Sequence, residues 1–245
     1  MPAPSPAFFD GGLYQGTAFS FGFPGLNNPQ RVAGSCIYEI SHPLSWGERR
    51  KEKASDMLKV GIIVGSTRPG RKAAAVAKWA YDLLKGRQDA EFEIVDIEDY
   101  KLPLLDEPVP PSMHQYGKAH TKTWSAKIDS FDAYIFVTPE YNHSVPAALK
   151  NAIDFLFREW NNKAAGFIGY GSAGGVRAVE SLRLVMGEIK VADVRAQVML
   201  SLRTDFENFT TFKPHELHDK AVHAMADEVI AWGEALKGLR EAARK

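Results

Sequence analysis

The chain divides by its pattern of apolar and polar positions into an irregular first segment and a regular second one. From Met57 on, short apolar runs alternate with longer stretches whose apolar positions lie three and four residues apart. The runs predict strands, and the wider spacing predicts helices with one face on a core. Strands are expected at 58–64, 92–97, 133–137, 164–169 and 194–200. Helices are expected at about 72–85, 118–130, 146–159, 176–189 and 215–239.

The last predicted helix has the clearest apolar stripe of the chain. Its apolar residues recur at intervals of three and four, so one side of the helix is expected to face the core. The stripe consists of Val222, Met225, Val229, Trp232, Leu236 and Leu239.

Strands and helices alternate five times, which predicts a doubly wound α/β domain with a parallel sheet and helices on both faces. Several strands are apolar at nearly every position, as in sheets that are covered on both sides. Ligands of such sheets bind beyond the carboxyl ends of the strands. The loops after the first, third and fourth strands are therefore expected to meet at one edge and to contact one ligand.

Residues 1–56 are rich in Pro, Gly, Ser and Phe and show no sustained period. Such a segment buries too little apolar surface to offset the entropy of ordering. We therefore expect a mostly disordered N-terminal extension at 1–56 and a compact domain at 57–245.

Composition narrows the possible partners. The formal net charge is zero and the isoelectric point is about 7.1, so no basic field would attract nucleic acid. The single cysteine, Cys36, excludes an internal disulfide and a cysteine-based metal site, and it favours a reducing, cytoplasmic location. No apolar stretch approaches the roughly 18 residues of a membrane span. We expect neither a metal site nor a membrane association.

The first loop, residues 65–72, reads GSTRPGRK. Gly65 is expected to let the chain turn off the strand. Ser66, Arg68 and Arg71 supply hydroxyl and guanidinium donors, next to the positive end of a helix dipole. The spacing differs from GxxxxGK[ST], so the loop fits a monophosphate better than a triphosphate with magnesium. The alternative is a surface turn whose arginines are only solvated.

The second loop, residues 138–146, reads TPEYNHSVP. Pro139 is expected to end the strand, and Ser144 is expected to cap the following helix. The backbone N–H groups between them have no expected secondary-structure partner, and the edge of a planar heterocycle can accept them. Tyr141 can supply an aromatic face. The alternative is a well-capped connector.

The third loop, residues 169–175, reads GYGSAGG and contains GxGxxG. A dinucleotide fingerprint needs an acid at the carboxyl end of the next strand, whereas Asp193 precedes the fifth predicted strand. We therefore expect the small residues to let a flat ligand approach the backbone. His143, the only histidine in these loops, is interpreted as a surface residue or as a proton donor or nicotinamide contact.

Together the three loops resemble those of the NADPH-dependent FMN reductase family of flavodoxin-like proteins, over about 57–239. GSTRPGR matches the pattern G-S-x-R-x-x-[RS], and TPEYNHSVPAALKNAIDFL matches TPEYN-x-S-x-P-x-x-LKN-A-[IL]-D. YGSAGGVRAVESLR resembles the third flavin loop and its helix. The resemblance implies a five-stranded sheet of order 2-1-3-4-5 and a bound FMN.

The resemblance also implies the roles of individual residues. Ser66, Arg68 and Arg71 would hold the FMN phosphate. The isoalloxazine edge would lie against Pro139, Glu140, Tyr141 and Asn142, and the third loop would approach the ring with Ser172, Gly174 and Gly175. His143 stands where many relatives carry Gly.

The implied activity is an FMN-dependent oxidoreductase. Hydride would pass from NADPH or NADH through FMN to a small-molecule acceptor such as a quinone, azo compound or flavin, in a ping-pong mechanism. FMN carries this chemistry, so no catalytic side chain is expected. The resemblance implies a homodimer or homotetramer, with candidate contacts at 157–162. The alternatives are a flavodoxin-like electron carrier, which the neutral charge disfavours, and an FMN-binding regulatory module.

Overall fold

The structure is a computed structural model and describes residues 57–243. The predicted disordered extension at 1–56, with Cys36, lies outside the described residues, so the expected disorder stays a prediction.

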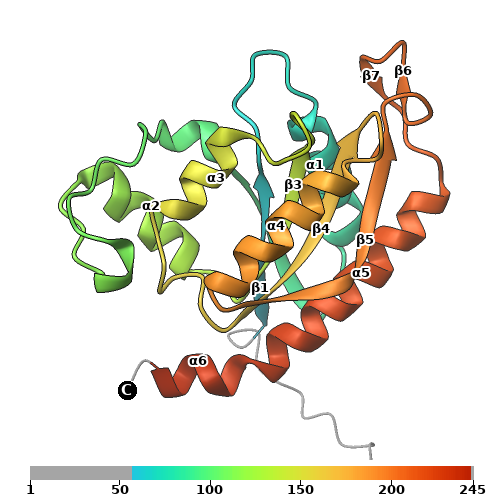
Figure 1. Ribbon diagram of the computed structural model, residues 1–245. Helices are drawn as coiled ribbons and strands as arrows, with labels where there is room; N and C mark the ends of the chain where they lie inside the picture. Colours follow the sequence, from blue (N-terminus) through green and yellow to red (C-terminus); the bar gives the residue numbers. More distant parts are fainter. Residues whose placement is uncertain (1–56, 244–245) are drawn as a thin grey trace, which may run out of the picture. The chain divides into compact units, whose positions relative to one another are not determined.

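The centre of the domain is a five-stranded parallel sheet of order β2-β1-β3-β4-β5 (Figure 1). This confirms the expected flavodoxin-like order. The strands are β1 (Leu58–Val64), β2 (Ala90–Asp96), β3 (Ala133–Pro139), β4 (Lys163–Gly171) and β5 (Val191–Ser201). In register, Val64 pairs with Asp96 and Val137, and Gly171 pairs with Ser201. The carboxyl ends of neighbouring strands are therefore level, which brings the loops that follow them to one edge.

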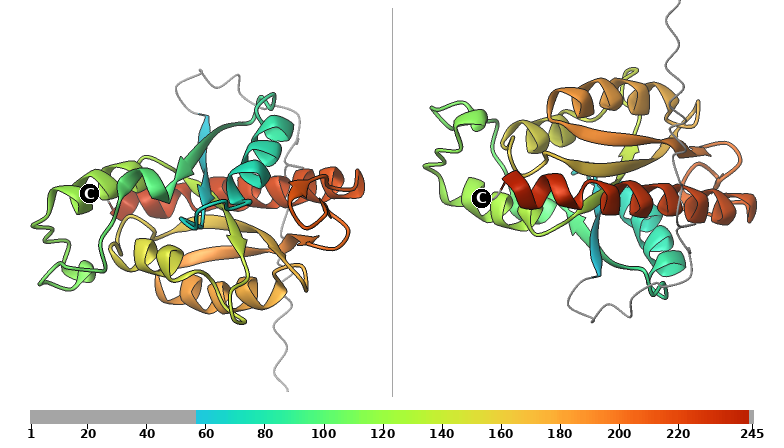
Figure 2. Two further views of the ribbon diagram at one scale, coloured as in Figure 1. Left: turned by 90° about the horizontal axis from the view of Figure 1, so that it is seen from above. Right: turned by 90° about the horizontal axis from the view of Figure 1, so that it is seen from below.

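Helices cover both faces of the sheet, as Figure 2 shows from above and below. The elements α1 (Ala73–Leu84) and α5 (Leu217–Ala235) pack on one face. The other face carries α2 (Ala119–Asp129), α3 (Ala147–Asp154) and α4 (Val176–Glu188). The sequence did not predict two 3-10 turns, a hairpin and a last short helix. These are η2 (Ile97–Tyr100), η3 (Pro111–Met113), β6 (Phe206–Glu207) with β7 (Thr211–Phe212), and α6 (Lys237–Ala243).

Alternate strand residues enter two separate cores. Ile62 of β1 packs with α1 and α5, whereas Ile63 faces α2, α3 and α4. The second core holds an aromatic cluster in which Trp160 is fully buried, with its ring 5.0 Å from that of Tyr134. The indole Nε1 of Trp160 donates to the carbonyl of Ile153 at 3.1 Å. Trp160 therefore packs in the core.

The stripe expected on the last helix is only half correct. Val222, Met225 and Val229 are fully buried, but Trp232 and Leu239 are 46% and 55% exposed. Next to Trp232, the buried residue of the helix is Gly233. It packs closely on Leu58, since a Cβ on Gly233 would lie 3.1 Å from the Leu58 methyl groups. The helix also ends at Ala235, so the pattern beyond that point belongs to α6.

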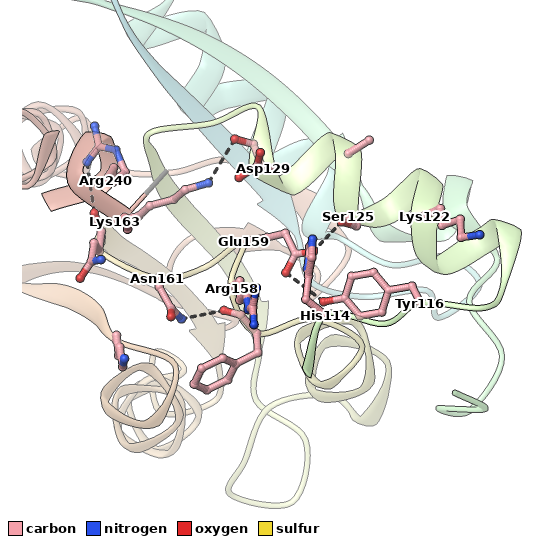
Figure 3. Close-up of a pocket in the computed structure, with 15 residues that line it drawn as sticks. His114, Tyr116, Lys122, Ser125, Asp129, Arg158, Glu159, Asn161, Lys163 and Arg240 are labelled. Carbon is pink, nitrogen blue, oxygen red and sulfur yellow. Dashed lines mark hydrogen bonds and ion pairs between the residues drawn. The ribbon is translucent and has the colours of Figure 1, made fainter. Parts of the chain in front are cut away.

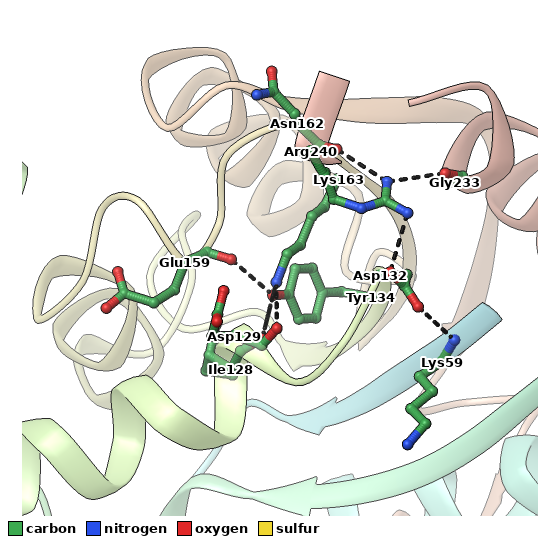
Figure 4. A network of polar contacts seen from close by, with 10 residues as sticks. All are labelled: Lys59, Ile128, Asp129, Asp132, Tyr134, Glu159, Asn162, Lys163, Gly233 and Arg240. Atoms are coloured by element: carbon green, nitrogen blue, oxygen red, sulfur yellow. Dashed lines mark hydrogen bonds and ion pairs between the residues drawn. The ribbon is translucent and has the colours of Figure 1, made fainter. Parts of the chain in front are cut away.

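The amino ends of the strands are held by two buried cations (Figure 4). Arg240 of α6 donates to the carbonyls of Gly233 and Asn162 at 2.9 and 3.2 Å, and its Nη2 lies 3.1 Å from Asp132 Oδ1. Lys163 at the start of β4 donates to the carbonyl of Ile128 at 3.0 Å. Buried charges are tolerated when hydrogen bonds satisfy them, so these contacts fix α6 to the sheet.

Asp193 lies near the amino end of β5, as expected, and it binds a helix instead of pointing toward the ligand edge. Its partner is Arg183 of α4, which also donates to the carbonyl of Val194 at 2.8 Å. Asp193 therefore has a structural role, which agrees with rejecting the dinucleotide reading of the third loop.

Among residues 57–243, no group of three or more His, Cys, Asp or Glu side chains is placed to hold a metal ion. No helix in the same range has both the length and the apolar character needed to cross a membrane.

Candidate functional site

A cavity of about 170 Å³ lies at the carboxyl ends of the strands, where the three predicted loops meet. The first loop contributes Arg68 and Arg71, the second contributes Tyr141, and β4 contributes Tyr170 and Gly171. The expected convergence is thus present for the first two loops and for the start of the third. Ser172, Gly174 and Gly175 lie outside the lining of this cavity.

Gly65 is required for a different reason from the one expected. Its N–H donates to the carbonyl of Val137 at 2.8 Å. A Cβ at this position would lie 2.8 Å from that carbonyl oxygen and from a methyl group of Leu149. Close approach of β3 and α3, and not a positive φ, therefore selects glycine here.

The first loop presents donors around the start of α1. Ser66 is fully buried, and its Oγ lies 3.4 Å from the N–H of Arg68. Within residues 57–243, the N–H groups of Thr67, Gly70 and Ala74 have no protein acceptor. Free N–H groups at a helix N-terminus, where the dipole is positive, favour an anion.

Arg71, a predicted phosphate ligand, is bound by two carboxylates at the end of β2. Its Nη2 lies 2.6 Å from Asp96 Oδ2, and its Nη1 pairs with Glu98. The remaining donor, Nε, is buried and has no hydrogen-bond partner among the described residues. A buried donor without a partner costs about 1–3 kcal/mol, which the oxygen of a bound anion would relieve. The residues present therefore fit a phosphate group.

Tyr170 is a site residue that the sequence analysis missed. It is the residue before last of β4, is 5% exposed, and lines the cavity. Burial, together with the neighbouring Tyr141, raises the pKa of Tyr170 well above its usual value of 10.0. The phenol thus keeps its proton at neutral pH and offers an O–H donor. Its place at the carboxyl end of a strand was the signal that could have found it.

Tyr141 connects the first two loops. It was expected at the ring edge, and its hydroxyl lies 3.2 Å from Ser66 Oγ. The guanidinium carbon of Arg68 lies 5.9 Å from the centre of its ring, within the range of a cation–π contact. The side chain of Tyr141 therefore joins the second loop to Ser66 and Arg68 of the first loop.

The second loop begins two residues later than expected, because β3 continues through Pro139. The N–H of Glu140 donates to the carbonyl of Tyr170 at 3.0 Å. Tyr141 and Ser144 then exchange two backbone hydrogen bonds, of 2.9 and 3.1 Å. Pro139 is thus tolerated because it is the last residue of the strand, and the loop is closed by its own backbone.

The tip of this loop is a two-residue turn in the left-handed region. Asn142 and His143 have φ of 49° and 68°. Positive φ at both central residues is the signature of a type I′ hairpin turn. Within the described chain, no protein acceptor meets the N–H groups of these two residues. The expectation of unpaired amides is therefore confirmed for Asn142 and His143 and wrong for Glu140 and Tyr141.

Ser144 does not cap the next helix. The helix α3 begins at Ala147, with Pro146 at the cap position and no side-chain cap. The hydroxyl of Ser144 lies 2.9 Å from that of Ser181 on α4. Closure of the turn leaves Ser144 two residues too early to reach the first turn of α3, so it tethers the turn to α4.

The glycines of the third loop have a packing role. Gly174 and Gly175 have φ of 69° and 70°. A Cβ on Gly175 would lie 2.4 Å from the backbone nitrogen of Tyr170, and one on Gly174 would lie 3.1 Å from Met199 Cβ. Glycine is thus required here by contacts within the protein. Approach of a flat ligand to this loop stays a prediction.

Arg177, at the start of α4, is a second residue that the sequence analysis missed. Its guanidinium pairs with Glu140, and its Nη1 lies 2.8 Å from His143 Nε2. Its N–H donates to Glu140 Oε2 at 3.2 Å. A basic residue two positions after the Gly-rich loop, with an acid in the neighbouring loop, was the available signal.

A larger cavity of about 800 Å³ lies at the opposite edge of the sheet (Figure 3). It contains none of the predicted site residues. Its buried Glu159 is 3% exposed and accepts hydrogen bonds from Tyr116, at 3.0 Å, and from Ser125. Ligands of parallel sheets bind at the carboxyl ends of the strands, so we assign the site to the smaller cavity.

The chain matches a sequence model described as NADPH-dependent FMN reductase over residues 58–205. It is 43% identical over 159 residues to an NAD(P)H-dependent FMN reductase of Nectria sp, covering 61% of this chain and 79% of that protein. It is 33% identical over 186 residues to an NAD(P)H-dependent FMN reductase of Schizosaccharomyces pombe, covering 75% and 86%. A quinone reductase of Pseudomonas putida is 34% identical over 139 residues, covering 53% and 69%.

The fold of the chain is similar to that of solved structures. The flavoenzyme NAD(P)H:(acceptor) oxidoreductase FerB from Paracoccus denitrificans superposes with a TM-score of 0.59 at 22% identity. The superposition covers 73% of this chain and 98% of that one.

Proposed function

Because the chain belongs to the NADPH-dependent FMN reductase family, we propose that it binds FMN and passes hydride from NADPH or NADH to a quinone or similar small acceptor. The observation that carries this proposal is the cavity at the carboxyl ends of the strands, which the phosphate of FMN would fill. Two steps support it, one for each end of the cofactor.

At the phosphate end, the side chains around the cavity present donors. Arg68 and Arg71 Nε are cationic donors, and Tyr170 offers its O–H. The one carboxylate of the lining, that of Glu140, is engaged by Arg177. A cavity lined by hydrogen-bond donors, with few free acceptors, favours a ligand group that only accepts hydrogen bonds. A phosphate is such a group. Ser66 of the same first loop would add its hydroxyl.

At the ring end, the free N–H groups of Asn142 and His143 suit the acceptor atoms on the edge of a planar ring. Pro139, Glu140 and Tyr141 would line the same edge. Ser172, Gly174 and Gly175 would approach the ring from the third loop. When bound, FMN supplies the hydride-transfer chemistry, and the protein binds and orients it.

We propose a quinone as the acceptor class and a ping-pong order of substrates. The similarity to a quinone reductase of Pseudomonas putida supports the acceptor class. Asn142 and His143 are exposed, so the ring end is open to solvent, and the nicotinamide and the acceptor would occupy it one after the other.

The test is to load purified protein with FMN and to follow oxidation of NADPH and NADH with a benzoquinone, an azo dye and free FMN. We expect a yellow protein, turnover with the quinone, and parallel lines in double-reciprocal plots. A protein that takes up no FMN, or that oxidises neither nicotinamide with the quinone, contradicts the proposal. Stable FMN binding without turnover would instead favour an electron carrier or a regulatory module.

We also propose a homodimer or homotetramer, on the strength of the family resemblance. Arg158 is exposed within the candidate contact segment at 157–162. Light scattering after size-exclusion chromatography is expected to give at least twice the chain mass of 27.1 kDa. A monomer across the accessible concentration range contradicts this part.

A further inference from the structure

The turn at the ring end contains backbone strain that one side chain holds in place. Type I′ turns strongly favour Asn-Gly, because both central residues need positive φ. Here His143, with φ of 68°, takes the place of the glycine. Strain of this kind persists where the surrounding structure fixes it, and it concentrates at functional sites.

The group that fixes the turn is Arg177 of α4. Its guanidinium contacts both the first residue of the loop and the tip, because it pairs with Glu140 and lies 2.8 Å from His143 Nε2. The side chain of Glu140 is 5% exposed, and Arg177 is the cation that pairs with it. One residue at the start of a helix therefore supports both the start and the tip of this loop.

The contact with Arg177 also sets the role of one imidazole nitrogen. A guanidinium has donors and no acceptor, so His143 Nε2 accepts this hydrogen bond.

We propose that Arg177 is a positioning residue for the flavin ring. It holds Glu140 and His143 so that the free N–H groups of Asn142 and His143 stay fixed at the ring end. This inference rests on the proposed function. Without Arg177, the turn loses the contact that holds the left-handed conformation of His143, and the N–H groups become mobile before the ring binds. Preorganisation raises affinity by reducing this loss of freedom on binding.

FMN and riboflavin can show which end of the site a substitution disturbs. A change at the ring end acts on FMN and on riboflavin alike, because both carry the isoalloxazine ring. A change at the phosphate end acts on FMN alone. The ratio of the two affinities therefore reports which end a substitution disturbs.

The experiment titrates flavin-free, full-length protein with FMN and with riboflavin, following flavin fluorescence. Arg177→Met is expected to weaken both ligands by about tenfold, with their ratio unchanged. Arg68→Gln is expected to weaken FMN and to leave riboflavin within about twofold. The matched control is Arg183→Met, which removes another arginine–carboxylate pair of α4, that with Asp193, and is expected to leave both affinities unchanged.

A double-variant cycle tests the strain directly. His143→Gly removes the residue that strains the turn, so Arg177→Met is expected to weaken flavin binding less in that background than in the wild type. This rescue separates positioning from general destabilisation, since a damaged helix would not recover with a glycine in the turn. If Arg177→Met fails to fold, Arg177→Gln with and without His143→Gly gives the same comparison.

Two outcomes overturn the inference. In the first, Arg177→Met leaves both affinities within twofold or weakens FMN alone. In the second, its effect is the same with His143 and with Gly at that position. If the wild-type protein binds neither flavin, the proposed function fails instead, and the two failures are thereby distinguished.

Discussion

The hydroxyl oxygens of Ser66 and Tyr141 lie 3.2 Å apart, although 75 positions separate the two residues in the chain. The contact joins the loop after β1 to the loop after β3, across the cavity that we assign to the cofactor phosphate. It also engages the hydroxyl that Ser66 would offer to that phosphate. The site is therefore held partly by a bond that a bound phosphate would replace.

Tyr141→Phe is expected to separate stability from binding. Loss of one hydrogen bond lowers the free energy of unfolding of the flavin-free protein by about 0.5–1.5 kcal/mol. FMN affinity is expected to stay equal or to rise, because the Ser66 hydroxyl becomes free to donate. Urea unfolding followed by circular dichroism and an FMN titration check the two parts. A fall in FMN affinity at unchanged stability contradicts this account.

Tyr170→Phe tests the residue contributed by β4. A hydrogen bond to a charged group is worth about 1.5–3 kcal/mol, so FMN is expected to bind about tenfold or more weakly. Riboflavin, which lacks the phosphate, is expected to bind as it does to the wild type. Equal weakening of both ligands would show that the phenol acts on the ring or on packing instead.

Arg71→Met is expected to weaken FMN binding more than the loss of one donor would. It removes the buried Nε donor and leaves Asp96 and Glu98 without their cation beside the phosphate site. We expect a weakening of about 100-fold, because like charges then add to the lost bond. Adding Asp96→Asn is expected to restore part of the affinity in the same titration. No recovery in the double variant would rule out the charge effect.

Asp205 makes stability depend on pH. Burial alone would raise the pKa of Asp205, but bonds from the N–H of Ser201, the hydroxyl of Thr204 and the N–H of His215 hold it below its usual 3.8. A lowered pKa in the folded state gives stability that is present above pH 3.8 and is lost as the pH falls through the folded-state value. Asp205→Asn is expected to be less stable than the wild type at pH 7, and this difference is expected to shrink below about pH 4. Urea unfolding of both proteins at pH 7 and pH 3 measures it, and an equal difference at both pH values would contradict the assignment.

The parallel sheet and the position of the candidate site could be predicted from patterns along the chain, whereas the sheet order came from the family resemblance of the three loops. Apolar runs such as 133–137 indicate strands that are buried on both faces, and parallel topology places the loops that follow at one edge. Helix ends were less predictable. Trp232 continues an apolar spacing but is exposed, because the adjacent Gly233 packs on Leu58 and the helix ends two residues later.

Side-chain contacts between loops could not be predicted from local patterns. Tyr170 reaches the cavity because it pairs with Pro139 in the sheet register, and that register is a long-range property. Arg177 contacts His143 because a turn of two left-handed residues brings the imidazole toward α4. The position of Ser144 in the sequence predicted a helix cap, but the same turn places its hydroxyl next to that of Ser181.

The donor character of the cavity has a practical consequence for handling the protein. Arg68, Arg71 and Tyr170 meet any tetrahedral oxyanion with the same groups, whether it belongs to a cofactor or to a buffer salt. Sulfate or phosphate in a purification buffer is therefore expected to compete with the cofactor and to slow its uptake. Measured flavin content would then depend on the choice of buffer anion as much as on the protein itself.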